Sequence, residues 1–110
     1  MRWPFWRVAV AERSMEPALR PGDWLVFYRT ITPGRSPRVR PGQVVVARHP
    51  ERPEKLIVKR AARREPDGWW LTSDNPSAGA VDSRVFGAVP PALIEGRLVW
   101  RYRRSRAGRP

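Results

Sequence analysis

Short apolar runs separated by turn residues recur along the chain, and their spacing predicts strands rather than helices. Residues 5–11 alternate loosely between apolar and polar positions, which is typical of a strand. Residues 24–28 form a continuous β-prone run, which predicts a mostly buried strand. Further strands are predicted at 43–47, 55–63 and 69–72, with a hairpin turn at Pro66-Asp67-Gly68 between the last two.

The remaining segments complete an all-β prediction. Residues 85–89 predict a short strand that Pro90-Pro91 ends, and residues 92–102 predict a last strand that Glu95-Gly96 bends. Loops are predicted where proline, glycine and polar residues gather, at 30–41, 49–54 and 73–84. We therefore predict six or seven short strands with almost no helix, arranged as a small barrel or coiled sheet. A single domain is expected over 1–102, followed by a basic, disordered tail over 103–110.

Composition limits the chemistry. The 110 residues include no cysteine and one histidine, which excludes thiol chemistry, disulfides and thiolate-bound metals and argues against a zinc site. We therefore predict no cofactor and no metal. No apolar run approaches the roughly 20 residues that cross a bilayer, and the N-terminus has no signal-peptide core. These patterns predict a cytoplasmic protein without a stable membrane anchor.

Charge suggests the kind of partner. The chain has 22 Lys and Arg against 10 Asp and Glu, a formal charge of +12. Such an excess favours nucleic acid, an anionic membrane surface or an acidic peptide. Together with the interleaved aromatic residues, it leaves a small nucleic-acid-binding β-barrel as an alternative function. The basic residues are spread along the chain, so the charge could equally serve only to solubilise the surface.

One stretch offers a nucleophile. Ser14 lies in a turn that Pro17 stiffens, between two predicted strands. A serine needs a base to take its proton. Lys59 closes the aliphatic run 56–58, and burial there would lower its pKa towards the neutral amine that can act as a base.

Each of these residues also has a plainer interpretation. Taken alone, Ser14 is more often a capping hydroxyl at a turn, and Lys59 is more often a solvent-facing side chain whose stem covers apolar surface. The lone histidine, His49, lies in a proline-rich segment that is a poor place for a buried base, so we predict no catalytic role for it.

Four motifs in order along the chain resemble the type I signal peptidase family. They are Ser14-Met15-x-Pro17-x-Leu19 with Gly22-Asp23, then Lys59-Arg60, Ser73-Asp74-Asn75-Pro76, and Asp82-Ser83-Arg84-x-x-Gly87. The ordered set covers about residues 8–100, so it is far more specific than any one motif. Within the family, the chain is most similar to the short members without an anchor that mature nickel-type superoxide dismutase.

The resemblance implies a small all-β serine endopeptidase that cleaves an N-terminal leader from a precursor protein, with nickel-type superoxide dismutase as the candidate partner. It implies that Ser14 is the nucleophile, that its backbone N–H donates to the oxyanion, and that Lys59 is the general base. Five more residues are implied to support the pair: Met15 and Pro17 in the turn, and Asp82, Ser83 and Arg84 beside the lysine. Asp23 either braces the turn after Ser14 or is solvated.

Two positions depart from the family pattern. Glu12 stands where many members have a serine or glycine that helps to form the oxyanion hole, so we expect its carboxylate to point away. Ala80 stands where many members have a serine that orients the lysine, and we expect Ser77, Ser83 or a water to orient Lys59 instead. A relative that binds peptides but cleaves them weakly is therefore a further alternative.

Overall fold

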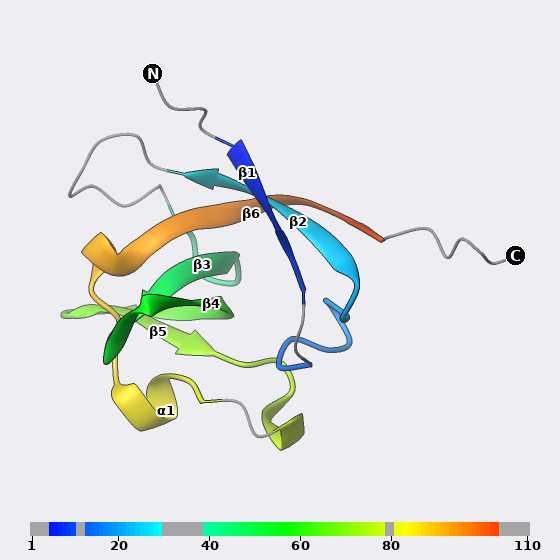
Figure 1. Ribbon diagram of the computed structural model, residues 1–110. Helices are drawn as coiled ribbons and strands as arrows, with labels where there is room; N and C mark the ends of the chain where they lie inside the picture. Colours follow the sequence, from blue (N-terminus) through cyan, green and yellow to red (C-terminus); the bar gives the residue numbers. More distant parts are fainter. Residues whose placement is uncertain (1–4, 11–12, 30–38, 79–80, 104–110) are drawn as a thin grey trace, which may run out of the picture.

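A single antiparallel sheet dominates the computed structural model, which describes residues 5–10, 13–29, 39–78 and 81–103 (Figure 1). The described residues form six strands: β1 (Phe5–Ala9), β2 (Asp23–Arg29), β3 (Val44–His49), β4 (Arg52–Glu65), β5 (Gly68–Thr72) and β6 (Ile94–Arg103). Helix is limited to one short turn, α1 (Ser83–Phe86), and two 3-10 turns, η1 (Pro76–Ala78) and η2 (Pro91–Leu93). The predicted all-β class is confirmed.

The strands pair in the order β1-β2-β6-β3-β4-β5, so the last strand of the chain lies in the middle of the sheet. All of these pairs are antiparallel. Register shifts occur in β2–β6, β3–β6, β3–β4 and β4–β5, and such bulges increase the local twist of a sheet. The strands therefore curl into the coiled shape that Figure 1 shows.

The hairpin between β3 and β4 is longer than predicted. β3 continues to His49 and β4 begins at Arg52, so only Pro50 and Glu51 separate the two strands. The predicted loop over 49–54 is therefore wrong. Proline at position 53 is compatible with a strand here because it lies where the register of β3 and β4 shifts, between Arg52 and Leu56, and proline is tolerated at such bulges.

The predicted strand over 85–89 is also wrong. Ser83–Phe86 forms a helical turn because an Asp82 carboxylate oxygen accepts a hydrogen bond from the Arg84 N–H and caps its start. Gly87 ends the turn with φ of 80°, a conformation that favours glycine. Val85 and Phe86 are therefore helical, and of the predicted strand Val89 alone contacts the sheet, through an isolated bridge to Trp69.

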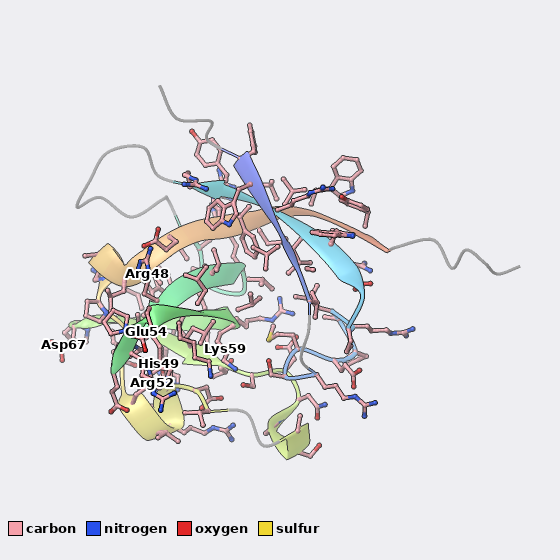
Figure 2. All side chains as sticks on the ribbon, viewed as in Figure 1. Arg48, His49, Arg52, Glu54, Lys59 and Asp67 are labelled. Atoms are coloured by element: carbon pink, nitrogen blue, oxygen red, sulfur yellow. The ribbon has the colours of Figure 1, made fainter. Side chains whose placement is uncertain are left out.

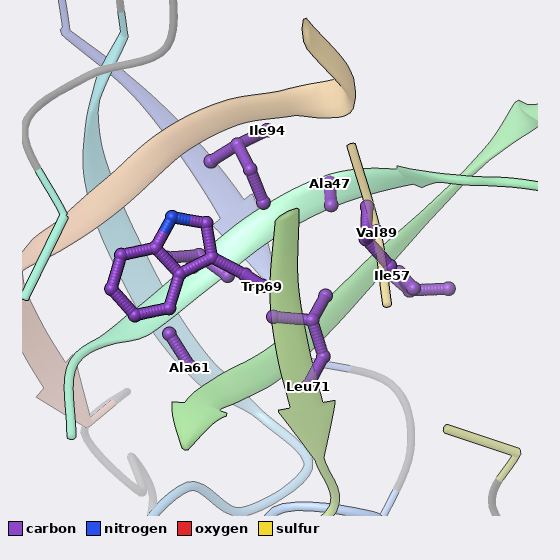
Figure 3. Packing of buried hydrophobic residues seen from close by; sticks show 8 residues of the cluster. Ala47, Ile57, Ala61, Trp69, Leu71, Val89 and Ile94 are labelled. Carbon is purple, nitrogen blue, oxygen red and sulfur yellow. The ribbon is translucent and has the colours of Figure 1, made fainter. Parts of the chain in front are cut away.

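Two apolar clusters pack on the two faces of β3. Val45 and Ala47 belong to the first cluster, whereas Val44 and Val46 belong to the second. Successive side chains of a strand point to opposite faces, so this central strand contributes to both. Figure 3 shows the first cluster, which is completed by Ile57, Ala61, Trp69, Leu71, Val89 and Ile94. The second also contains Met15, Leu19, Leu25 and Phe27.

Several predictions fall on residues outside the described part of the chain. They include most of the loop predicted at 30–41 and all but the first residue of the tail predicted at 103–110. Glu12 and Ala80, the two departures from the family pattern, also lie outside it. β6 extends to Arg103, one residue into the predicted tail.

Candidate active site

The turn that carries Ser14 is fixed to the protein at both ends. Two backbone hydrogen bonds join the ends of the turn, from Val10 N to Asp23 O at 2.8 Å and from Gly22 N to Val10 O at 3.0 Å. Met15 and Leu19 are buried in the second cluster, which anchors the turn to the core. Pro17 is exposed on the outside of the turn. The serine is thus presented on backbone that is held by packing.

Asp23 braces this turn. Its side chain is 3% exposed, and one carboxylate oxygen accepts a hydrogen bond from the Arg20 N–H at 3.0 Å. From the sequence, Asp23 was expected either to brace the turn or to be solvated, and its burial and this hydrogen bond agree with the first expectation. A buried carboxylate is stable only when hydrogen bonds or charges compensate it, so Asp23 ties the turn to the start of β2.

Ser14 itself is held by the segment that follows β5. Its carbonyl oxygen accepts a hydrogen bond from Asn75 N at 2.7 Å, and the Asn75 side-chain amide donates to the Arg13 carbonyl at 3.0 Å. In Figure 1 the segment after β1 accordingly lies beside the segment after β5. Ser14 is 7% exposed. Two of the four motifs, distant in sequence, therefore meet at the serine.

Lys59 is buried in β4, with 4% of its surface exposed. Its Nζ atom lies 3.0 Å from Ser73 Oγ and hydrogen-bonds to it. Ser73 is itself buried and directly follows β5. Figure 2 shows Lys59 on the hairpin of β3 and β4, together with His49 and Arg52. The amine is thus oriented by a hydroxyl, which was expected, but by a serine that sequence reasoning missed.

Ser77 and Ser83, the two serines expected to orient the lysine, have other partners. Ser83 Oγ accepts a hydrogen bond from Leu71 N at 2.8 Å. Ser77 Oγ hydrogen-bonds to the Asn75 side chain at 2.8 Å. Of the expected alternatives, Ser83 thus supports the backbone of β5 and Ser77 closes a local turn, whereas the hydroxyl bonded to Lys59 is that of Ser73.

Asp82 organises the loop behind Ser73. Its carboxylate accepts hydrogen bonds from Ser73 N at 2.9 Å and from Arg84 N, Nε and Nη2 at 3.0 Å each. Burial, the largest single influence, raises the pKa of the Asp82 carboxyl, but these hydrogen bonds and the Arg84 charge outweigh it and hold that pKa below its usual value. An ionised Asp82 therefore fixes the backbone that presents Ser73 to Lys59.

Both candidate catalytic residues line one groove, which has a volume of about 1240 Å³. Ser14 and Lys59 line it together with apolar residues of β1 and β4 and with Val81 and Val85. His49 also lines this groove and is 9% exposed, so describing it as a loop histidine was wrong. Among the described residues, no group of three or more His, Cys, Asp or Glu is placed to hold a metal ion.

Comparison with known families places the chain in a peptidase family. The model of the family described as Peptidase S24-like matches residues 6–87, which span the Ser14 turn, Lys59 and the Asp82 loop. The chain belongs to this family. The predicted relationship to signal peptidase I-type peptidases is thereby confirmed at family level.

Three mitochondrial proteases are similar to this S24-like chain. The ATP-independent inner membrane protease subunit 1b of Arabidopsis thaliana is 30% identical over 109 residues, which cover 80% of this chain and 64% of the relative. The inner membrane protease subunit 1 of Xenopus tropicalis is 32% identical over 108 residues, covering 80% and 63%. The inner membrane protease subunit 2 of Schizosaccharomyces pombe is 30% identical over an alignment of 116 positions, which covers 88% of this chain and 64% of the relative.

The S24-like chain spans slightly less than two thirds of the length of these relatives. Within the part that the structure describes, no helix is both long and apolar enough to cross a membrane.

Proposed function

We propose that the chain is a serine endopeptidase in which Ser14 is the nucleophile and Lys59 is the general base. The observation that carries this proposal is that the two side chains, which come from different elements, are both buried and line one groove. Membership of the Peptidase S24-like family supports the same reaction class.

The proposed chemistry uses few groups. Burial disfavours a charged ammonium, so a lysine at 4% exposure is a suitable site for a neutral amine. Neutral Lys59 takes the Ser14 proton, Ser14 Oγ attacks the scissile carbonyl, and the new ammonium protonates the leaving amine. Lys59 then deprotonates a water that hydrolyses the ester. Ser73 holds the amine in position throughout.

The Ser14 backbone N–H is the proposed oxyanion donor. Among the hydrogen bonds between described residues, none uses this N–H as donor. One such donor is typically worth about 3–4 kcal/mol of the reaction barrier.

The edges of two strands suggest how a peptide binds. Residues 55–59 of β4 all line the groove, and β5 pairs with β4 only from Arg60 onward. Val8 and Ala9, at the end of β1, also line the groove, and β1 is an edge strand of the sheet. An extended substrate can therefore add as a strand along the β4 edge, with main-chain hydrogen bonds holding it in register.

We propose a precursor protein with a cleavable N-terminal leader as the substrate, and nickel-type superoxide dismutase as the first precursor to test. The support is the resemblance of the four motifs to the short members that mature this enzyme. The cytoplasmic location stays a prediction from the sequence.

Cleavage of precursor proteins by purified variants tests the pair. We expect Ser14→Ala and Lys59→Ala each to reduce the cleavage rate by at least about a thousandfold. Ser77→Ala, a hydroxyl loss in the neighbouring turn, should leave the rate unchanged. Circular dichroism of each variant controls for folding. Wild-type rates in either of the first two variants would refute the proposed dyad.

A second candidate function has one observation in its favour. The register of β1, β2 and β6 places Trp24, Trp100 and Tyr102 on one face, where Arg7 lies 4.5 Å above the Trp24 ring. Aromatic rings beside cations are typical of surfaces that bind single-stranded nucleic acid. Binding of a single-stranded oligonucleotide that weakens steeply with salt and is lost in Trp100→Ala would support it.

A further inference from the structure

The groove carries an excess of positive charge. Among the described residues that line it, Arg13, Arg52, Lys55 and Lys59 are basic and Glu51 is acidic. The Arg13 Nε atom lies 4.0 Å from Glu16 Oε2, and Lys59 Nζ hydrogen-bonds to Ser73 Oγ. The positive charge that remains available to a ligand therefore belongs mainly to Arg52 and Lys55.

These two side chains differ from the other basic residues of their hairpin. Within the described residues, Arg52 and Lys55 make no side-chain hydrogen bond and no ion pair. The other arginines of β3 and β4 are all engaged: Arg48 with Glu95, Arg60 with Asp74, Arg63 with Glu65, and Arg64 with the Glu65 and Gly68 carbonyls. The unpaired cations of this hairpin are thus the two that line the groove.

The hairpin tip that carries them is fixed. His49 Nδ1 accepts a hydrogen bond from Glu51 N at 3.0 Å, which closes the two-residue turn. The His49 ring packs 5.0 Å from the Phe86 ring of α1. Arg48 Nη1 donates to the Pro53 carbonyl at 2.9 Å. The positions of Arg52 and Lys55 along the groove are therefore set by the fold, and Figure 2 shows Arg52 beside His49 on this hairpin.

Strand geometry converts this arrangement into a distance along the substrate. Lys55 precedes Lys59 by four positions on β4, directly before Leu56, from which the pairing of β4 with β3 is regular up to Arg60. A strand rises about 3.3 Å per residue, so the two side chains are about 13 Å apart along the edge. A peptide paired with this edge advances at the same rate. A substrate residue opposite Lys55 is therefore about four residues from the one opposite Lys59.

We propose that the groove selects peptides that carry an Asp or Glu about four residues from the scissile bond, with Lys55 binding that carboxylate and Arg52, which lines the same groove, adding to the positive charge around it. This inference rests on the proposed endopeptidase function and names its substrate class. A peptide fits better than a polyanion such as nucleic acid because the described lining of the groove combines an unpaired strand edge and apolar side chains with a small number of cations.

Matched peptides test the inference. The probes are internally quenched peptides with an Ala-Xaa-Ala core, in which each of six positions on either side of the core is in turn Asp or its neutral isostere Asn. We expect Asp to raise kcat/KM about three- to tenfold at one position near the fourth, because exposed ion pairs are individually weak. The preference should shrink as salt is added.

Charge variants assign the preference to the two residues. Arg52→Gln/Lys55→Gln should cleave the Asp and Asn peptides at equal rates. Arg40→Gln/Arg101→Gln removes the same charge from two exposed residues that do not line the groove, and it should keep the preference. A preference that survives in the first variant, or equal rates for Asp and Asn at all positions in the wild type, would overturn the inference.

Binding to the Ser14→Ala protein separates this inference from the function on which it rests. If the wild type cleaves none of the peptides, the proposed function fails. Tighter binding of Asp peptides to Ser14→Ala, lost when Arg52 and Lys55 are also changed, would still support the acidic subsite. Equal binding of the Asp and Asn peptides would reject it. Competition by a single-stranded oligonucleotide without any Asp preference would indicate a polyanion surface instead.

Discussion

The Lys59–Ser73 hydrogen bond depends on a single irregularity in the sheet. Near the hairpin turn, Arg63 pairs with Trp70. If this register continued along the two strands, Asp74 would lie opposite Lys59. A shift between Ala61 and Arg63 moves the pairing by one residue, so Arg60 faces Thr72 and Lys59 faces Ser73. The hairpin was predictable from Pro66-Asp67-Gly68, but the bulge was not. This is why sequence reasoning found the lysine and missed the serine that orients it.

Removal of the Ser73 hydroxyl should weaken catalysis. We expect Ser73→Ala to lower kcat/KM about tenfold, because one hydrogen bond that positions the base is lost. The pH dependence of kcat/KM should change as well, which a purely structural role would not cause. Ser73→Thr keeps the hydroxyl and should restore most of the rate. An unchanged rate and pH profile in Ser73→Ala would show that this contact does not serve the base.

Asp82 should stabilise the fold through its charge. We expect Asp82→Asn to lower the free energy of unfolding by about 1–3 kcal/mol, because a buried acceptor for four donors is weakened. Asp67→Asn, an exposed carboxylate in the β4–β5 turn, should change it by less than about 0.5 kcal/mol. Urea denaturation of both variants at neutral pH measures the difference.

The direction of the Asp82 pKa also predicts a pH dependence. Its folded-state pKa is lowered below the value of about 3.9 expected in the unfolded chain. Its contribution is therefore fully present above that value and is lost as pH falls through the folded-state pKa. The gap in stability between wild type and Asp82→Asn should narrow from about pH 5 to about pH 2. A gap that stays constant over this range would contradict the assignment.

Among the elements, the start of β5 depends on a glycine. Gly68 has φ of 146°, and a Cβ atom there would lie 2.0 Å from the Val89 carbonyl oxygen. That carbonyl accepts a hydrogen bond from Trp69 N at 2.9 Å, so it cannot withdraw without breaking the bridge between the two segments. The close approach therefore fixes the connection that returns the chain from α1 to the sheet.

Substitution of this glycine should be costly. We expect Gly68→Ala to destabilise the protein by about 3 kcal/mol or more, because backbone strain and a backbone clash add together. Gly42→Ala is the matched control: φ there is also positive, at 93°, but no atom lies within 4 Å of the added methyl group. It should cost only about 1–2 kcal/mol. Similar melting temperatures for the two variants would contradict this explanation.

The elements show which sequence patterns are reliable. The strands β2 and β5 were predicted within one residue at each end, because continuous β-prone runs are bounded by clear turn residues. The segment 85–89 was misread because its apolar residues also fit one helical turn, and the Asp82 cap decides between the two. The hairpin around His49 was missed because two prolines were read as a loop.

For the whole molecule, the sheet order could not be predicted from the chain. β6 inserts between β2 and β3, and such pairings depend on contacts between residues far apart in the sequence. The candidate site was nevertheless predictable in part, because the order of the four motifs indicates family membership and does not depend on knowing how the strands pair. The groove and its unpaired cations, Arg52 and Lys55, required the structure.

The central claim is that Ser14 forms a covalent acyl intermediate with help from Lys59. Rapid mixing with a cleaved peptide, acid quenching and intact-protein mass spectrometry test it most directly. We predict an adduct with the mass of the acyl fragment, mapped to Ser14, and neither adduct nor product with Ser14→Ala. Lys59→Ala should form the adduct far more slowly. An adduct on another residue, or product formation by Ser14→Ala at the wild-type rate, would contradict the account.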